Sequence, residues 1–238
     1  MREGAKANKS NVERQFDNLF SHKVDTVYDF NSKKMSRKDK GIISCLENYG
    51  LKGKKCLDIG PGTGRWVQFI AGNSPDCIAA IDISNESLSR CSSNCEYLQK
   101  ANLELDKFDF EDDFFDVVVS FEVLEHLQDP SNYLKEVQRV TKPGGLILMS
   151  LPNIASFISR VRLLLGILPP AIANDPTHVS FYRKRDIEKL IKNFGLSAIF
   201  IPTSISINPA THKGILRIPS NKYISQFDDS LLFYILNK

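Results

Sequence analysis

The amino-acid sequence predicts an α/β fold, a doubly wound parallel sheet with helices on both faces. From Lys55 onward, short apolar runs alternate with longer segments whose apolar residues have helical spacing. The runs are apolar at nearly every position, which is typical of strands buried on both faces. This alternation favours right-handed crossovers within one parallel sheet. The predicted strands are 55–60, 77–83, 114–121 and 145–152.

Helices are expected between these strands, at 63–72, 85–93 and 129–141. Ser84 or Asn85 can cap the second helix. Asp129 followed by Pro130 is expected to give the third its cap and its first-turn proline. The Lys-Pro-Gly-Gly stretch at 142–145 should end that helix and turn the chain into the next strand.

The rest of the chain departs from this rhythm. An apolar, proline-containing insert occupies 153–180. A helix is expected at 184–194, a strand at 196–206 and a last strand at 230–237. Because ligands of open α/β sheets bind outside the carboxyl ends of the strands, the residues that follow each strand are the candidates for a site.

The composition is that of a globular protein. Of 238 residues, 42% are hydrophobic and 25% charged, which excludes collagen, coiled coil and wholesale disorder. The apolar run from Leu163 to Asn174 is shorter than the roughly 18 residues of a membrane helix, so no membrane span is expected. The amino terminus lacks the apolar core of a secretion signal, and the five cysteines are dispersed. These features favour a reducing, cytoplasmic location.

The charge is unevenly spread along the chain. Residues 1–55 hold 13 Lys/Arg and 7 Asp/Glu, a balance of 13 − 7 = +6, which leaves 3 − 6 = −3 for the remainder. No block of five or six like charges occurs, so we interpret the basic part as solvated helix surface. Without a basic tract interleaved with aromatic residues, nucleic acid is not the expected partner.

The most specific motif is a glycine turn that follows the first predicted strand. Gly60, Gly62 and Gly64 let the chain turn tightly and pass close to a ligand. A dinucleotide fingerprint needs a further glycine at position 65, which is Arg here. The Gly-Lys-Ser/Thr of a phosphate-binding loop is also missing.

Two carboxylates accompany this turn. Asp58 stands inside the first strand, where it would repel a pyrophosphate and attract an ammonium group. Asp82 ends the second strand, where a carboxylate can accept both hydroxyls of a ribose. The pair indicates a nucleoside with a cationic amino-acid tail as the ligand.

These residues resemble motifs of the class I S-adenosylmethionine (SAM)-dependent methyltransferases, of the small-molecule type similar to ubiquinone-pathway methyltransferases. The glycine turn with Asp58 is similar to the first motif of that superfamily, and AIDIS at 80–84 to the second. FDVVV at 115–119 resembles the fourth-strand motif, and the stretch 139–145 resembles the turn before the fifth strand. The resemblance covers about 55–204.

The resemblance implies a Rossmann-like sheet of seven strands, mostly parallel, whose last strand is antiparallel. It implies a single methyltransferase domain over 1–238, made of an N-terminal helical flap (1–50), a donor-binding core (51–152), an acceptor insert or lid (153–182) and the C-terminal half of the sheet (183–238). SAM is the implied cofactor. The implied donor-binding residues are Asp58, Gly60, Pro61, Gly62, Thr63, Gly64, Asp82, Ile83, Asn102, Leu103 and Phe121.

The loop after the third strand departs from the family pattern, which usually offers an acid to the adenine amino group. Asn102 and Glu104 both fall in this loop, and we prefer Asn102 together with the Leu103 amide. Residues 101–116 hold seven acids, but their spacing matches no calcium loop. We interpret that segment as a solvated loop.

The segment after the fourth strand contains Phe121, Glu122, Glu125 and His126. Phe121 and Glu122 fall where the family lines its donor and acceptor pockets. In one interpretation, His126 or Glu122 is a general base that removes a proton from an acceptor hydroxyl. In another, Glu122, Glu125, His126 and His178 bind a divalent cation, because Glu-x-x-Glu-His is found in small-RNA 2′-O-methyltransferases and ubiquinone-pathway O-methyltransferases. In the third, this segment is a common scaffold, and His126 caps a helix or bonds to the backbone.

His178 precedes the helix expected at 184–194, and the resemblance puts it over the acceptor pocket. A polar residue there can orient or deprotonate the substrate, and a structural turn histidine is the alternative. We name His126, Glu122 and His178 as candidate catalytic residues, assign no metal ligand, and keep the cation as an alternative. Methyl transfer itself needs mainly alignment and exclusion of water, because the sulfonium is already a strong electrophile.

Two segments are expected to cover the pocket. The apolar stretch 154–173 can be a lid, a wall for a hydrophobic acceptor, a helix on a membrane surface, or simple packing against the sheet. The N-terminal stretch 12–49 is expected to add a helix and a flap, with Tyr28 as a pocket residue or a residue of the core edge.

The sequence therefore predicts a methyltransferase that acts on a small-molecule acceptor, at an oxygen of a sugar or secondary metabolite. The alternative is an RNA or protein methyltransferase, metal-assisted at Glu122, Glu125, His126 and His178. A non-catalytic donor-binding module is a third option. The basic N-terminal part leaves an anionic acceptor open, and the sequence allows a homodimer without deciding the oligomeric state.

Overall fold

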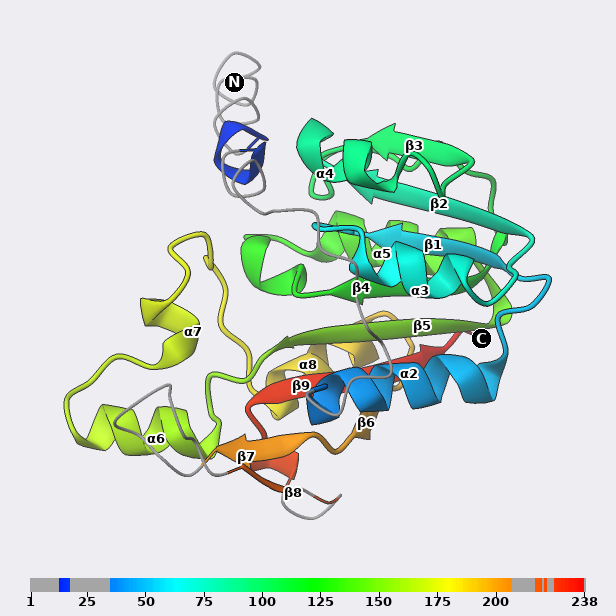
Figure 1. Ribbon diagram of the computed structural model, residues 1–238. Helices are drawn as coiled ribbons and strands as arrows, with labels where there is room; N and C mark the ends of the chain where they lie inside the picture. Colours follow the sequence, from blue (N-terminus) through cyan, green and yellow to red (C-terminus); the bar gives the residue numbers. More distant parts are fainter. Residues whose placement is uncertain (1–12, 18–34, 207–216, 220, 222–224, 238) are drawn as a thin grey trace.

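A computed structural model describes residues 13–17, 35–206, 217–219, 221 and 225–237. The main sheet has seven strands in the order β3-β2-β1-β4-β5-β9-β6 (Figure 1). Strands β3, β2, β1, β4 and β5 are parallel, and β9 runs antiparallel between β5 and β6. The predicted seven-stranded, mostly parallel Rossmann-like sheet with an antiparallel last strand is confirmed. The strands are β1 (Lys55–Ile59), β2 (Cys77–Asp82), β3 (Tyr97–Lys100), β4 (Phe115–Phe121), β5 (Thr141–Pro152), β6 (Ile199–Ile201) and β9 (Ser230–Leu236).

Helices cover both faces of this sheet, as its doubly apolar strands require. The core on one face packs α2, α3 and α4 against the strands, and the core on the other packs α5 and α8. Within β1, neighbouring residues point to opposite cores: Cys56 belongs to the first, and Leu57 to the second. The helices are α2 (Arg37–Tyr49), α3 (Arg65–Ala71), α4 (Asn85–Cys91), α5 (Ser131–Val140) and α8 (Lys184–Asn193), with α6 (Phe157–Leu164) and α7 (Pro170–Ala173) in the insert.

Helix starts follow the sequence signals with small shifts. Ser84 caps α4, and its Oγ accepts a hydrogen bond from the Ser87 amide, as predicted. The predicted cap at Asp129 is wrong by one position: Pro130 precedes the first residue of α5, while Asp129 Oδ1 accepts from the Ser131 amide at 2.9 Å. The carboxylate therefore still satisfies an amide of the first turn.

Two predicted strand boundaries need correction. Strand β5 begins at Thr141, so the expected turn at 142–145 forms the first part of the strand, with Gly144 at φ +76°. The strand predicted at 196–206 is broken after β6, because Pro202 cannot donate to a ladder. The chain continues as β7 (Ser204–Ser206), which pairs with β8 (Arg217–Pro219) in a separate two-stranded sheet.

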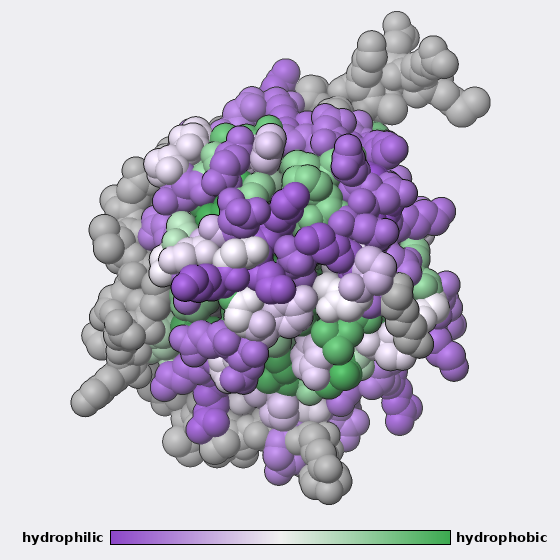
Figure 2. Space-filling view, turned by 90° about the vertical axis from the view of Figure 1, so that its right-hand side faces the viewer, coloured by the Kyte–Doolittle hydropathy of each residue, from purple (hydrophilic) through white to green (hydrophobic). Residues whose placement is uncertain are grey.

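Figure 2 looks at the end of the molecule where the parallel strands begin, and this surface is mostly hydrophilic. Asp116 fixes that end: it accepts from the Lys55 amide at 2.9 Å and pairs with Lys142 at 2.9 Å. Burial works to raise the pKa of Asp116, but these donors outweigh it and hold the pKa below its ordinary value. The opposite end, where the strands finish, carries the site.

Candidate functional site

The glycine turn after β1 adopts the predicted conformation. Gly60, Gly62 and Gly64 have φ of +72°, +57° and +74°, in the left-handed region that glycine tolerates. A Cβ on Gly60 would lie 2.5 Å from Cγ2 of Val123, so this position lacks room for a side chain as well. Gly64 is the N-cap of α3, which begins at Arg65, two residues later than the expected start at Thr63. The turn therefore places glycine backbone next to the space beyond the carboxyl ends of the strands.

Asp82 lies at the carboxyl end of β2 with its carboxylate held in place. Its Oδ1 accepts from the Ser84 amide at 2.9 Å, and its Oδ2 accepts from Ser87 Oγ at 2.6 Å. Burial raises the pKa of Asp82, although these donors oppose the shift. Each oxygen has a further lone pair, so the carboxylate can still accept ligand hydroxyls.

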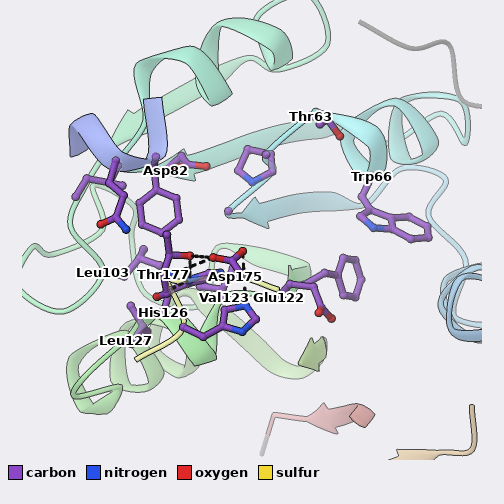
Figure 3. A pocket seen from close by; sticks show the side chains of 18 of the residues that line it. Thr63, Trp66, Asp82, Leu103, Glu122, Val123, His126, Leu127, Asp175 and Thr177 are labelled. Atoms are coloured by element: carbon purple, nitrogen blue, oxygen red, sulfur yellow. Dashed lines mark hydrogen bonds and ion pairs between the residues drawn. The ribbon is translucent and has the colours of Figure 1, made fainter. Parts of the chain in front are cut away.

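One cavity of about 590 Å³ opens at this end of the sheet (Figure 3), a volume typical of small-molecule sites. It extends from the glycine turn and Asp82 to His126 and His178. Asp58 and Gly64 are not among the described residues that line it, and the donor contacts of the whole predicted set stay predictions. The other predicted donor residues do line it: Gly60, Pro61, Gly62, Thr63, Asp82, Ile83, Asn102, Leu103 and Phe121.

Asp58 is buried outside the lining of the cavity, with 1% of its surface exposed. Its Oδ2 has no hydrogen-bond partner in the described part of the chain. Burial, followed by repulsion from Asp82, raises the pKa of Asp58 to about 8. A buried carboxyl without a partner is one that a nearby positive charge would ionise.

The hydrogen-bond partners of Asn102 and Glu104 bear on which of the two is free to contact the adenine. Both line the cavity. Glu104 Oε1 already accepts from the amides of Gln128 and Asp129 at 2.8 and 2.7 Å. Asn102 Oδ1 accepts only a local bond, from the Glu104 amide at 3.0 Å. The Glu104 carboxylate therefore braces the loop after η1 (Leu124–His126), which supports our preference for Asn102.

Glu122 is engaged with a residue that the sequence did not indicate. Lys38 Nζ, from α2, lies 2.9 Å from Glu122 Oε1, and Ser150 Oγ donates to the same oxygen at 2.8 Å. Burial works to raise the pKa of Glu122, but Lys38 outweighs it and the pKa is lowered. Glu122 also has φ +58°, a strained value for a residue other than glycine. The expected catalytic carboxylate is thus one half of an ion pair.

His126 and His178 line the far end of the cavity, and the buried Glu125 lies next to them without lining it. One ligand atom from each lies within 4.8 Å of the others. Glu125 is 2% exposed, and neither of its carboxylate oxygens has a hydrogen-bond partner in the described structure. Burial, then Glu122, raises its pKa well above the ordinary value. The fourth residue of the predicted cation set, Glu122, is not part of this cluster.

The two imidazoles of this cluster each bond to the main chain through Nδ1. His126 Nδ1 lies 3.1 Å from the carbonyl oxygen of Thr177, and His178 Nδ1 lies 2.7 Å from that of Ala171. Their ring centroids are 4.9 Å apart. Burial lowers the pKa of His126. The bond to backbone expected of a scaffold histidine is present, and the same residue also lines the cavity.

Sequence reasoning missed several residues of the cavity wall. Lys38 and Asp39 come from α2, and Asp39 holds Arg65 at 3.1 Å. Trp66 packs against Phe121, with ring centroids 5.2 Å apart. The wall also includes Gln15 and Phe16 from the short helix at 13–17.

Their signals were weak for two reasons. The α2 residues lie far from the motifs in sequence. Trp66 comes just after the glycine turn, but a tryptophan at that position is also typical of the hydrophobic core. Tyr28, the pocket residue expected in the flap, lies outside the described residues.

The insert carries the α6 and α7 helices, and α6 packs near β7. Its apolar side chains are largely turned to solvent, with Leu164 at 87% exposed. Ala171 of α7 contacts His178, so the insert reaches the end of the cavity where His126 and His178 lie. No helix among the described residues has the length and apolar character that crossing a membrane requires.

Comparison with known proteins identifies the family. Residues 24–199 match the model of a methyltransferase domain family. A ubiquinone biosynthesis O-methyltransferase of Acinetobacter baylyi is 33% identical over 110 residues, which span 44% of this chain and 46% of that protein. A protein of the same name from Aliivibrio fischeri is 28% identical over 179 residues, 70% of this chain and 74% of the relative.

Solved structures share the fold at low identity. Magnesium protoporphyrin IX methyltransferase of Synechocystis, solved with bound SAH, has a TM-score of 0.63 and 14% identity, covering 97% of this chain and 100% of that one. YcgJ protein of Bacillus subtilis has a TM-score of 0.62 and 16% identity, covering 84% and 98%. The match to the family model, which spans most of the chain, together with the glycine turn and Asp82, places this protein in the methyltransferase domain family as a SAM-dependent methyltransferase.

Proposed function

We propose that this enzyme transfers the methyl group of SAM to an oxygen of a small-molecule acceptor, such as a sugar or a secondary metabolite. The observation that carries the proposal is one continuous cavity, because it joins the glycine turn and Asp82 to His126 and His178. The groups proposed for the donor and those proposed for the acceptor therefore share one space. The relatives named O-methyltransferases support oxygen as the methylated atom.

The reaction requires the protein to align the donor with the acceptor and to accept one proton from the acceptor hydroxyl. When bound, SAM supplies a methyl group on sulfonium, which the acceptor oxygen attacks as the carbon–sulfur bond breaks. The hydroxyl proton passes to a base, for which His126 is our candidate, since imidazole is basic near neutral pH. Alignment alone can contribute about 7–11 kcal/mol. The walls formed by Asp82, Trp66 and Val123 would hold the partners and exclude water.

A divalent cation is a second proposal for the same site. Its specific support is Glu125, a carboxylate 2% exposed and without a hydrogen-bond partner among the described residues. The Nε2 of His178 lies 3.9 Å from Glu125 Oε1 and 3.8 Å from Asp175 Oδ2. A cation between these atoms would give the Glu125 carboxylate a partner and would take Nε2 of His178 as a ligand. Glu125, His126 and His178 would hold it, and it would polarise the acceptor oxygen.

The test is transfer of radiolabelled methyl groups from SAM into a fractionated cell extract, then into a panel of phenols, catechols and sugars. We expect the label in the small-molecule fraction, as a methyl ether of the acceptor. Label confined to protein or RNA would overturn the proposal.

The cation is tested in the same assay with EDTA, followed by readdition of Mg²⁺ or Mn²⁺. We expect EDTA to abolish transfer and one of these ions to restore it. Unchanged transfer in EDTA would reject the cation and leave the base mechanism standing. We also propose a cytoplasmic location, which the five free cysteines support.

A further inference from the structure

The segment Asp175–His178 crosses the acceptor end of the cavity and is linked to His126 by hydrogen bonds (Figure 3). Thr177 Oγ1 lies 2.5 Å from Asp175 Oδ1, and the Thr177 amide donates to the same oxygen at 2.9 Å. His126 Nδ1 lies 2.9 Å from Thr177 Oγ1 and 3.1 Å from the Thr177 carbonyl oxygen. Asp175, Thr177 and His126 all line the cavity.

Counting donors fixes where the proton of His126 resides. A carbonyl oxygen only accepts, and the single hydroxyl hydrogen of Thr177 is directed to Asp175, a carboxylate that also only accepts. Neither group of Thr177 can then donate to the imidazole. The short contacts at Nδ1 are hydrogen bonds only if Nδ1 itself carries the hydrogen. In a neutral ring this leaves Nε2 unprotonated.

We propose that Thr177 and Asp175 are positioning residues that hold His126 as its Nδ1–H tautomer and so keep Nε2 available to the acceptor. The inference rests on the proposed function, because an available Nε2 matters only if His126 serves the acceptor. The same nitrogen receives the hydroxyl proton or binds a cation, so the inference holds for either mechanism.

The second histidine is held in a matching way, which argues for orientation rather than accidental contact. His178 Nδ1 lies 2.7 Å from the carbonyl oxygen of Ala171, a residue of α7 that precedes this segment in the chain. Asp175 Oδ2, the oxygen not used by Thr177, lies 3.8 Å from His178 Nε2. Residues 171–178 thus supply a carbonyl acceptor to each ring, and Asp175 of the same stretch places a carboxylate near His178.

Asp175 is the residue whose removal should change the tautomer. Without its carboxylate, the Thr177 hydroxyl is free to turn and donate to His126 Nδ1, in competition with the bond from Nδ1–H to the Thr177 carbonyl oxygen, and the Nε2–H tautomer would then become populated. Thr177→Ser keeps every donor and acceptor and should behave like the natural protein. A merely structural role for this turn would lower stability in Asp175→Ala and leave the tautomer unchanged.

The tautomer can be measured directly, without substrate, by nitrogen-15 NMR of histidine-labelled protein above pH 8, with His126→Gln assigning the signals. We expect Nδ1 to carry the proton in the natural protein and in Thr177→Ser, and Asp175→Ala to gain Nε2–H signal. Asp109→Ala, an exposed acid away from the cavity, is the control. A natural protein protonated at Nε2, or an Asp175→Ala spectrum equal to it, would overturn the proposal.

Kinetics supplies the second readout, with the acceptor found in the labelling experiment. We expect Asp175→Ala to lower kcat about 10- to 100-fold with little change in KM for SAM, and Thr177→Ser to retain activity. An unchanged kcat alongside a changed tautomer would overturn the positioning role. If no hydroxyl compound accepts the methyl group, the proposed function fails, whereas the NMR result still decides the tautomer.

Discussion

Asp58 and Asp82 stand on the neighbouring strands β1 and β2, and of the two only Asp82 reaches the cavity. The Asp82 carboxylate is oriented by Ser84 and Ser87, whereas one oxygen of Asp58 has no partner among the described residues. Two carboxylates in one motif therefore have different electrostatic surroundings. They lead to different predictions, one for donor binding and one for stability.

Asp82→Ala should weaken SAM binding about 10- to 100-fold, the equivalent of losing charge-assisted hydrogen bonds worth roughly 1.5–3 kcal/mol. Isothermal titration with SAM measures the loss. Asp76→Ala, an exposed acid that precedes β2, is the matched control and should bind normally. Equal affinity in Asp82→Ala and the natural protein would contradict a ribose-binding role for Asp82.

Asp58 should make the unliganded protein less stable as the pH rises. Its pKa in the folded state is raised to about 8, above the value of about 3.9 in an unfolded chain. The protonated carboxyl is thus favoured by folding: its contribution is full below about pH 4 and is lost as the pH rises towards about 8. Urea unfolding between these limits should show a falling free energy of unfolding.

Asp58→Asn is the matched variant for this pH effect, since it keeps the shape of the side chain but does not titrate. We expect its free energy of unfolding to depend less on pH over the same interval. A slope identical to that of the natural protein would show that Asp58 does not titrate there.

Two variants can separate the backbone strain at Gly60 from its steric contact with Val123. Gly60→Ala places a Cβ at φ +72° and against Val123, whereas Gly53→Ala has φ +69° with nothing within 4 Å. Both should incur about 1–2 kcal/mol of backbone strain, and Gly60→Ala should be destabilised further and lose SAM binding. Urea unfolding of both variants gives the difference. Equal destabilisation of the two would mean that the Val123 contact costs nothing.

The Lys38–Glu122 ion pair should stabilise the fold modestly. Because the Glu122 side chain is 38% exposed, we expect a coupling energy of only about 0.5–1 kcal/mol. Urea unfolding of Lys38→Met, Glu122→Gln and the double variant gives this energy as a double-mutant cycle. Lys40→Met, an exposed lysine of the same helix, controls for loss of charge. Additive effects of the two substitutions would show that the pair is not coupled.

The sequence allowed prediction of those parts whose signals are local. The glycine turn, the buried strands and Asp82 belong to contiguous motifs in which residue type and spacing carry the information. Lys38 was missed because its partner Glu122 lies 84 positions away, and nothing near Lys38 marks it. Our prediction of one strand at 196–206 did not take account of Pro202, which directly follows β6 at the edge of the sheet and ends it.

The end of the cavity at His126 was harder to predict, for a physical reason. Thr177 and Asp175 matter through their bonds to His126, and such bonds appear only when the insert folds back over the strand ends. The domain boundaries within 1–238 and the homodimer stay predictions.

The short helix at 13–17 should slow the release of the donor, because it joins both sides of the cavity. Asp17 Oδ1 accepts from Ser84 Oγ at 2.6 Å, beside Asp82, and the Phe16 ring packs 5.2 Å from that of His126. Asp17→Ala removes the charged acceptor for the Ser84 hydroxyl, a bond worth roughly 1.5–3 kcal/mol. We therefore expect SAM to dissociate about tenfold faster, as measured by stopped-flow fluorescence of Trp66.

Arg14→Ala is the matched control, since Arg14 lies on the exposed side of the same short helix and should leave the dissociation rate unchanged. If Asp17→Ala releases SAM at the natural rate, residues 13–17 do not retain the donor. A faster release in Phe16→Ala alone would assign retention to the aromatic contact with His126. Because Ser84 lies two residues after Asp82, a faster release in Asp17→Ala alone would instead assign retention to the Asp82 side of the cavity.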